Sequence, residues 1–184
     1  MHSSARSLLS LGTSLLTLVV AVPSVASAQG TLRPVHVTAA PVENRGAQYQ
    51  AEAEALPTRI DQFAKAARLY ERSALARPAD DTATATCLRM AAFLHYYSGD
   101  SRAGASLMEK AARRAAEFGD VAVAAGSYID AAIIAAEADQ GEHALDLGRR
   151  AEQLTKSPLL TDSQRDALKI RMAGWHEVAV ALEK

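Results

Sequence analysis

The fold is decided by residues 88–95, which read Leu-Arg-Met-Ala-Ala-Phe-Leu-His, because variants of this stretch occur twice more. Residues 128–135 read Tyr-Ile-Asp-Ala-Ala-Ile-Ile-Ala, and residues 170–177 read Ile-Arg-Met-Ala-Gly-Trp-His-Glu, so the copies begin 40 and 42 residues apart. In each copy a bulky residue is followed, three and four positions later, by two small residues and then by another bulky one. Adjacent small residues let two helix backbones approach closely, so these stretches predict closely packed helices.

Another helical stretch lies between these copies and repeats with them. Residues 69–74 align with residues 107–112, and residues 147–152 form a weaker third copy. Ala, Leu, Glu and Arg, which are strong helix formers, dominate from about residue 45 onward. Paired helices that recur about every 40 residues predict an all-α domain built as a helical repeat array.

The predicted breaks between helices are regularly spaced. Gly99, Gly119 and Gly141 are each followed by an acidic residue. A glycine can end a helix in the left-handed conformation, and the acidic residue after it can cap the next helix. Turns about 20 residues apart, with no long loops between them, require neighbouring helices to run antiparallel.

The last predicted helix begins after a residue pair with the spacing of a capping box. Thr161 is followed three positions later by Gln164, so that each side chain can satisfy a backbone N–H of the other residue. We expect this helix to span about residues 161–183 and to cap a helical repeat domain over residues 45–184.

Residues 1–28 have the composition of an export signal. They contain one strong base, Arg6, and no acidic residue, and an apolar run follows over residues 8–22. Ala26 and Ala28 are the small residues that a signal peptidase requires just before its cleavage site. We expect a secretory signal peptide that is cleaved between Ala28 and Gln29, with an uncleaved membrane anchor as the alternative.

The segment after this signal differs from the helical domain. Residues 29–44 contain two prolines and several β-branched residues, which predicts an extended leader. The remaining chain has no second long apolar run, so no membrane span is expected after cleavage. The predicted location is therefore an exported one, either periplasmic in a bacterium or secreted.

Composition argues against several classes of function. The net charge of −1 gives no electrostatic reason to expect nucleic acid as a partner. The single cysteine, Cys87, excludes an internal disulfide framework and has no neighbouring base in the sequence that would activate it. The histidines are far apart and lack metal-ligand spacing, and no Gly-rich phosphate loop or nucleophile turn occurs. We expect no catalytic, cofactor-binding or metal-binding residues.

Two sets of residues have spacings known from one family of helical repeats. In one helix, small and aromatic residues and a proline fall at Ala66, Tyr70, Ser73 and Pro78. In the next helix, bulky and small residues fall at Leu88, Ala91, Ala92 and His95. Over about residues 45–183 the chain therefore resembles tetratricopeptide repeats, although its repeat is near 40 residues and theirs about 34.

This resemblance implies a short α-solenoid that binds proteins and is not a catalyst. In that family the first helix of each hairpin lines a groove, which here corresponds to Arg89, Phe93, Tyr96, Ile129, Ile133, Arg171 and Trp175. Two guanidiniums near aromatic rings could hold a carboxylate, such as a peptide C-terminus, by forked hydrogen bonds. The alternative is that the apolar members are core residues and that the two arginines are solvated.

We therefore expect an exported, non-catalytic scaffold that binds another protein or peptide of the cell envelope. One alternative is a helical bundle that binds a small hydrophobic molecule or a lipid between its Ala-lined helices. Another is an enzyme with polar groups converging around His95 or His176. The capping helix stays apolar at Val178 and Val180, so its surface is a candidate for a partner or for self-association.

Overall fold

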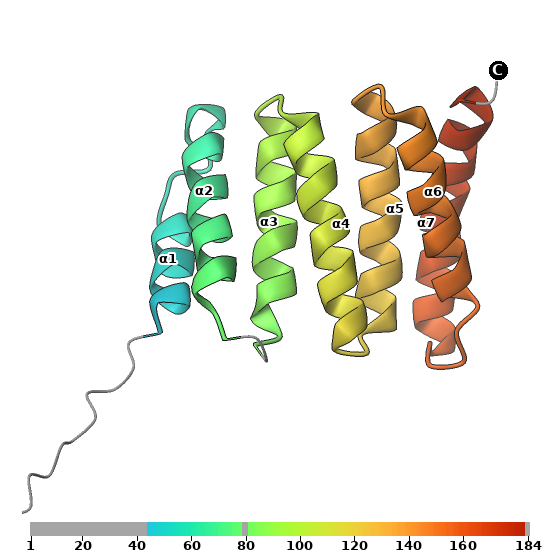
Figure 1. Ribbon diagram of the computed structural model, residues 1–184, viewed down its shortest axis with the longest axis horizontal. Helices are drawn as coiled ribbons and strands as arrows, with labels where there is room; N and C mark the ends of the chain where they lie inside the picture. Colours follow the sequence, from blue (N-terminus) through green and yellow to red (C-terminus); the bar gives the residue numbers. More distant parts are fainter. Residues whose placement is uncertain (1–43, 79–80, 183–184) are drawn as a thin grey trace, which may run out of the picture. The chain divides into compact units, whose positions relative to one another are not determined.

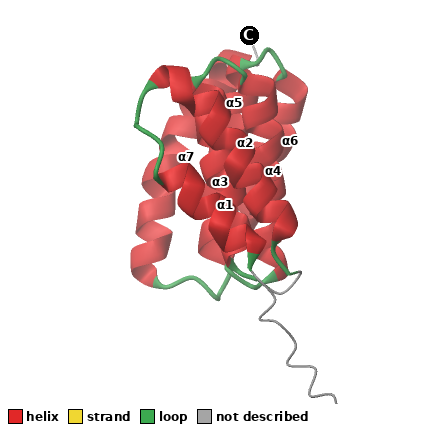
Figure 2. Cartoon of the chain, turned by 90° about the vertical axis from the view of Figure 1, so that its left-hand side faces the viewer, coloured by secondary structure: helices red, strands yellow, loops and turns green. Residues whose placement is uncertain are grey.

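The computed structural model describes residues 44–78 and 81–182, and all regular secondary structure in these ranges is helical, which confirms the all-α prediction (Figure 1, Figure 2). The described helices are α1 (Arg45–Glu54), α2 (Ile60–Ala76), α3 (Ala83–Tyr97), α4 (Ser101–Glu117), α5 (Val121–Glu137), α6 (Gly141–Thr155) and α7 (Asp162–Leu182). The predicted signal peptide, its cleavage site at Ala28 and Gln29, and the predicted leader up to residue 43 lie outside the described residues.

The helices pack in the order in which they occur in the chain. Each helix from α1 to α6 packs mainly against its neighbours in the chain, and α7 packs on both α5 and α6. Adjacent helices run antiparallel and are joined by short connections (Figure 1). None of the described helices is long and apolar enough to cross a membrane.

Three interhelical turns share one backbone geometry. In each, the N–H of the residue after the turn donates to a carbonyl five residues earlier: Asp100 to His95, Asp120 to Ala115, and Gln140 to Ala135, all at 2.9 Å. This is the Schellman pattern, whose preceding residue adopts a positive φ. Gly99 (φ 94°) and Gly119 (φ 75°) take this position as predicted.

The third turn shows that the prediction for Gly141 is wrong. Asp139, with φ 59°, takes the left-handed position, and Gly141 is the first residue of α6. Aspartate is one of the few residues other than glycine that tolerates this conformation, which explains why the glycine pattern misplaced the turn by two residues. The turns therefore recur every 20 residues, at 99, 119 and 139.

Side-chain caps are present at three of the four helix starts where the sequence predicts them. The carboxylates of Asp100 and Asp120 accept from the third N–H of α4 and of α5, at 3.0 and 3.1 Å. Gln140, before α6, makes no side-chain cap. At the start of α7 the capping box is confirmed, because Thr161 N–H donates to Gln164 at 2.9 Å and Gln164 N–H donates to the Thr161 hydroxyl at 3.2 Å.

The core is built largely from small side chains. Eight alanines in four adjacent pairs have no exposed surface: Ala91, Ala92, Ala111, Ala112, Ala124, Ala125, Ala131 and Ala132. Helix α4 approaches α3 so closely that a Cβ at Gly104 would lie 3.0 Å from the carbonyl oxygen of Ala92. Large residues are few, and the largest fully buried ones include Met108, Ile129 and Leu147.

One polar contact repeats along the chain. His95 Nε2 lies 2.7 Å from Glu71 Oε1, joining α3 to α2, and His176 Nε2 lies 2.9 Å from Glu152 Oε1, joining α7 to α6. The partners are 24 residues apart in both pairs. Helix α7 is thus held on α6 by the same contact that holds α3 on α2. The equivalent residues are 81 positions apart, which corrects by one residue the offset of 82 between residues 88–95 and 170–177 that the sequence repeat predicts.

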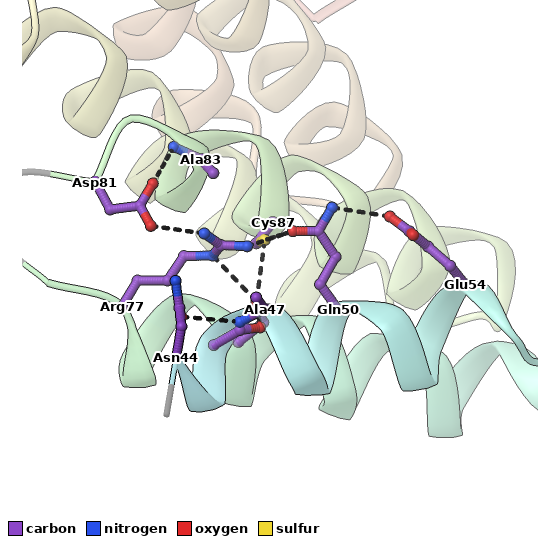
Figure 3. A network of polar contacts seen from close by, with 10 residues as sticks. Asn44, Ala47, Gln50, Glu54, Arg77, Asp81, Ala83 and Cys87 are labelled. Atoms are coloured by element: carbon purple, nitrogen blue, oxygen red, sulfur yellow. Dashed lines mark hydrogen bonds and ion pairs between the residues drawn. The ribbon is translucent and has the colours of Figure 1, made fainter. Parts of the chain in front are cut away.

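A buried polar network joins the first three helices (Figure 3). The Arg77 side chain, at the end of α2, is 7% exposed and donates from Nη1 to Asp81 at 2.6 Å. It also donates to Gln50 of α1 and, at 3.3 Å, to the Ser73 hydroxyl. The Cys87 thiol of α3 lies 3.2 Å from this hydroxyl, which in turn donates to a carbonyl of α1 at 2.7 Å.

The charges in this network stabilise one another. Burial by itself would lower the pKa of Arg77, but the hydrogen bond to Asp81, with a further contribution from Cys87, raises it above its ordinary value. The Arg77 hydrogen bond, followed by that from the Ala83 N–H, lowers the pKa of Asp81. Both shifts favour the ion pair, which fixes the connection between α2 and α3.

Replacing Asp81 by Asn should destabilise the fold by about 1.5–3 kcal/mol, because Arg77 stays buried without a carboxylate. The folded-state pKa of Asp81 lies below its unfolded value, so the contribution of the ion pair is complete above about pH 4 and is lost as the pH falls through the folded-state pKa. Urea unfolding over a pH series measures the free energy of unfolding. As the pH falls, this free energy should decrease less steeply for Asp81→Asn than for the parent.

Asp61→Asn provides the control for this experiment. Asp61 pairs with Arg59 at 3.0 Å, but the two side chains are 57% and 72% exposed. Exposed pairs contribute about 0–1 kcal/mol, so this variant should retain nearly the stability of the parent. Equal losses in the two variants would contradict a structural role for the Arg77 network.

Candidate functional site

Two of the predicted groove residues meet in one pocket. Arg89 of α3 and Arg171 of α7 are far apart in the sequence but line the same opening of about 200 Å³, which also involves the start of α5. The remaining lining residues are Ala122, Val123, Gln164, Ala167 and Leu168. The pocket therefore combines two guanidiniums and one amide with mostly apolar walls.

Arg171 is held in place by α5. Its Nη2 donates to the carbonyl oxygen of Gly126 at 2.8 Å and to the carboxylate of Asp130. A Cβ at position 126 would overlap the Arg171 guanidinium, so glycine is what lets this side chain lie against the helix. Asp130 is 17% exposed and neutralises much of the Arg171 charge.

Arg89 is the cation without a counter-ion in this pocket. It is half-buried, its Nε is shielded from solvent, and within residues 44–78 and 81–182 that nitrogen has no hydrogen-bond partner and the guanidinium no ion pair. The first turn of α5 adds the positive end of a helix dipole, although Asp120 already caps the N–H of Val123. A shielded guanidinium with unused donors favours an anionic ligand.

Aromatic residues continue this face of α3 beyond the pocket. Phe93 and Tyr97 follow Arg89 at intervals of four residues and stack with ring centroids 6.5 Å apart. Tyr97 is 61% exposed, and Phe63 of α2 lies against it at 6.5 Å. Sequence reasoning missed Tyr97 and Phe63; four-residue periodicity from Arg89 could have found Tyr97, whereas Phe63 comes from another helix.

Tyr96 points to a different part of the structure. Its Cβ lies beside Gly104 of α4. A hydrogen bond to Glu137, followed by burial and the charge of that carboxylate, raises the pKa of Tyr96. Tyr96 therefore joins α3 to α4 and to the end of α5, and does not line the arginine pocket.

The predicted apolar groove residues are mostly core residues. Ile129 is fully buried, and Ile133 is half-buried against the core. Trp175 is 2% exposed, and its indole lies directly over Gly148 of α6, where a Cβ would overlap the ring. Of the seven predicted groove residues, Arg89 and Arg171 line one pocket, whereas Phe93, like Ile133, is half-buried and packs against the core.

The remaining candidate groups are the histidines and Cys87. Among the described residues, no group of three or more His, Cys, Asp or Glu side chains lies together in a way that could hold a metal ion. Cys87 is 1% exposed, and although the sequence places no base beside it, Arg77 reaches it from the end of α2. Folding, and not sequence neighbourhood, creates this contact.

A comparison of the chain with protein-family models, with curated proteins and with solved structures found no match.

Replacing Gly148 by Ala tests the placement of Trp175 in the core. The new methyl group would displace a large buried indole, so we expect a loss of about 1–3 kcal/mol in unfolding free energy. Gly141→Ala is the matched control, since a Cβ there meets only Leu182 at an ordinary 3.6 Å. Unfolding by urea measures both, and an unchanged midpoint for Gly148→Ala would contradict the packing of Trp175.

Proposed function

We propose that this protein is an exported scaffold, similar to tetratricopeptide repeat proteins, that binds the carboxylate end of a peptide or protein in the pocket between α3, α5 and α7. The observation that carries the proposal is the shielded Arg89 guanidinium, which has no counter-ion in the described residues and lies beside Arg171. The scaffold holds this ligand without chemical change.

A carboxylate fits the donors of this pocket. A guanidinium presents parallel N–H groups that match the two oxygens of a carboxylate, and such charge-assisted bonds are stronger than neutral ones. Arg171 is already engaged by Asp130, so Arg89 supplies the charge that the ligand neutralises. The volume of about 200 Å³ suits a terminal residue and not a folded domain.

The aromatic stripe on α3 supports a peptide over a free anion. Each four-residue step along a helix advances about 6 Å, so Phe93 lies one step from Arg89 and Tyr97 two steps. An extended peptide covers a similar distance with two residues. Its terminal carboxylate would lie at Arg89 while an apolar side chain two residues earlier contacts Phe93.

The repeated backbone and side-chain features support the array interpretation. The turns at 99, 119 and 139 share one geometry, and the Glu–His contact of α2 and α3 returns between α6 and α7. Export is supported by residues 1–28, with their basic start, apolar centre and small residues before Gln29. A peptide ligand in the cell envelope is consistent with both.

A second candidate function is binding of a small hydrophobic molecule or lipid. Two openings of about 350 Å³ each lie between α6 and α7, on either side of His176 and Glu152. Met172 borders one opening and Trp175 the other. A rise in melting temperature with a fatty acid, but with no peptide, would favour this function.

The primary proposal is tested with a peptide library that varies the last four residues and is prepared with free-acid and amidated ends. We expect a subset of free-acid peptides to bind and the amidated forms to bind at least about tenfold more weakly, because charged hydrogen bonds are lost. Fluorescence anisotropy with the full chain measures the affinities.

Two variants separate the pocket from general surface charge. Arg89→Gln should weaken the free-acid peptides to the level of their amides, whereas Arg102→Gln, at an exposed position on α4, should leave them unchanged. Equal affinity of acids and amides in the parent would refute carboxylate recognition, and so would undiminished binding by Arg89→Gln.

A further inference from the structure

Within residues 44–78 and 81–182, no helix covers α7 in the way that α4 covers its counterpart α3. The repeated Glu–His contact makes α7 on α6 equivalent to α3 on α2, with residues 81 positions apart. In α3, Ala92 and Tyr96 are covered by α4, which approaches to within 3.0 Å of the Ala92 carbonyl oxygen. Their equivalents in α7, Ala173 and Glu177, are exposed within the described structure.

The uncovered face of α7 has the character of a helix contact. Its exposed residues share one side of the helix and are Asp166, Lys169, Ile170, Ala173, Glu177 and Val180. Ile170 is 76% exposed and Val180 is 54% exposed. Gly174 beside Ala173 has open space where a Cβ would be, so nothing described explains a helix-weakening glycine there.

We propose that this face is covered by α7 of a second copy of the chain, packed antiparallel about a two-fold axis at Ala173. This arrangement places Lys169 of each copy opposite Glu177 of the other, so that one Lys–Glu ion pair lies on each side of the small residues at the centre. Within its own helix Lys169 also pairs with Asp166 at 2.9 Å, and both of these side chains are exposed. A parallel pairing would instead place Lys169 beside Lys169 and Glu177 beside Glu177. Charge therefore favours the antiparallel pair.

The existing packing of the protein supports the same geometry. Helix α4 covers α3 antiparallel, so an antiparallel α7 from a second copy takes the place that α4 has in the α3–α4 hairpin. The same symmetry places Ile170 of the second copy over His176, between the two openings on the α6 side of α7. The contact is isologous, so assembly stops at two copies.

A charge exchange tests the pairing. The full chain, purified as the expressing cell processes it, is studied by sedimentation velocity over a concentration series, and we expect a monomer–dimer equilibrium. Lys169→Glu and Glu177→Lys should each weaken the dimer by about tenfold, since each creates two like-charge contacts. The double variant should restore the affinity of the parent, whereas Lys110→Glu on α4 should leave it unchanged.

The outcomes separate this proposal from its rivals. A monomer at all concentrations would overturn it, as would assembly that continues beyond two copies and so indicates head-to-tail stacking. Circular dichroism establishes that all variants are folded. If the folded double variant does not regain the dimer affinity of the parent, the antiparallel register is wrong. Ile170→Arg supplies an independent check, because it places a charge on the apolar part of the face and should abolish the dimer without unfolding the monomer.

Discussion

Small side chains at the helix contacts are the constraint on which the rest of this structure depends. Aromatic residues make up only 5% of the chain, and alanine pairs without exposed surface occupy the centres of α3, α4 and α5. An alanine buries little apolar area, so these helices gain stability from many close contacts and not from a few large residues. The bulky indole of Trp175 is accommodated because Gly148 faces it.

The same constraint shapes the pocket that Arg89 and Arg171 line. Because Gly126 has no side chain, Arg171 can lie against α5 and reach both the backbone and Asp130. The close packing then leaves room at the start of α5 for one more guanidinium, that of Arg89, but supplies no second carboxylate among the described residues. The unpaired charge of Arg89 is thus a consequence of how the helices pack, and the carboxylate of a ligand would neutralise it.

Sequence reasoning predicted local features well and contacts across the fold poorly. The all-helical class, the left-handed positions of Gly99 and Gly119 and the capping box before α7 follow from rules that act within a few residues. The groove list failed at Ile129 and Trp175, because small residues beside them mark a closely packed face and not an open one. The buried Arg77–Cys87 contact had no sequence signal, since it joins two helices through their packing.

Helix α7 has one face that forms part of the arginine pocket and another that no described residue covers. A partner on one face does not block the other. Arg171 projects toward α5 and builds the pocket, whereas Ile170, Ala173 and Glu177 lie on the opposite, uncovered side. Pairing two copies through the uncovered side would leave both arginine pockets open. Two sites held in one rigid assembly bind a ligand with two ends, or neighbouring ligands on a surface, more tightly than one site does. A weak single-carboxylate pocket would then gain affinity from the symmetry of the dimer and not from further contacts.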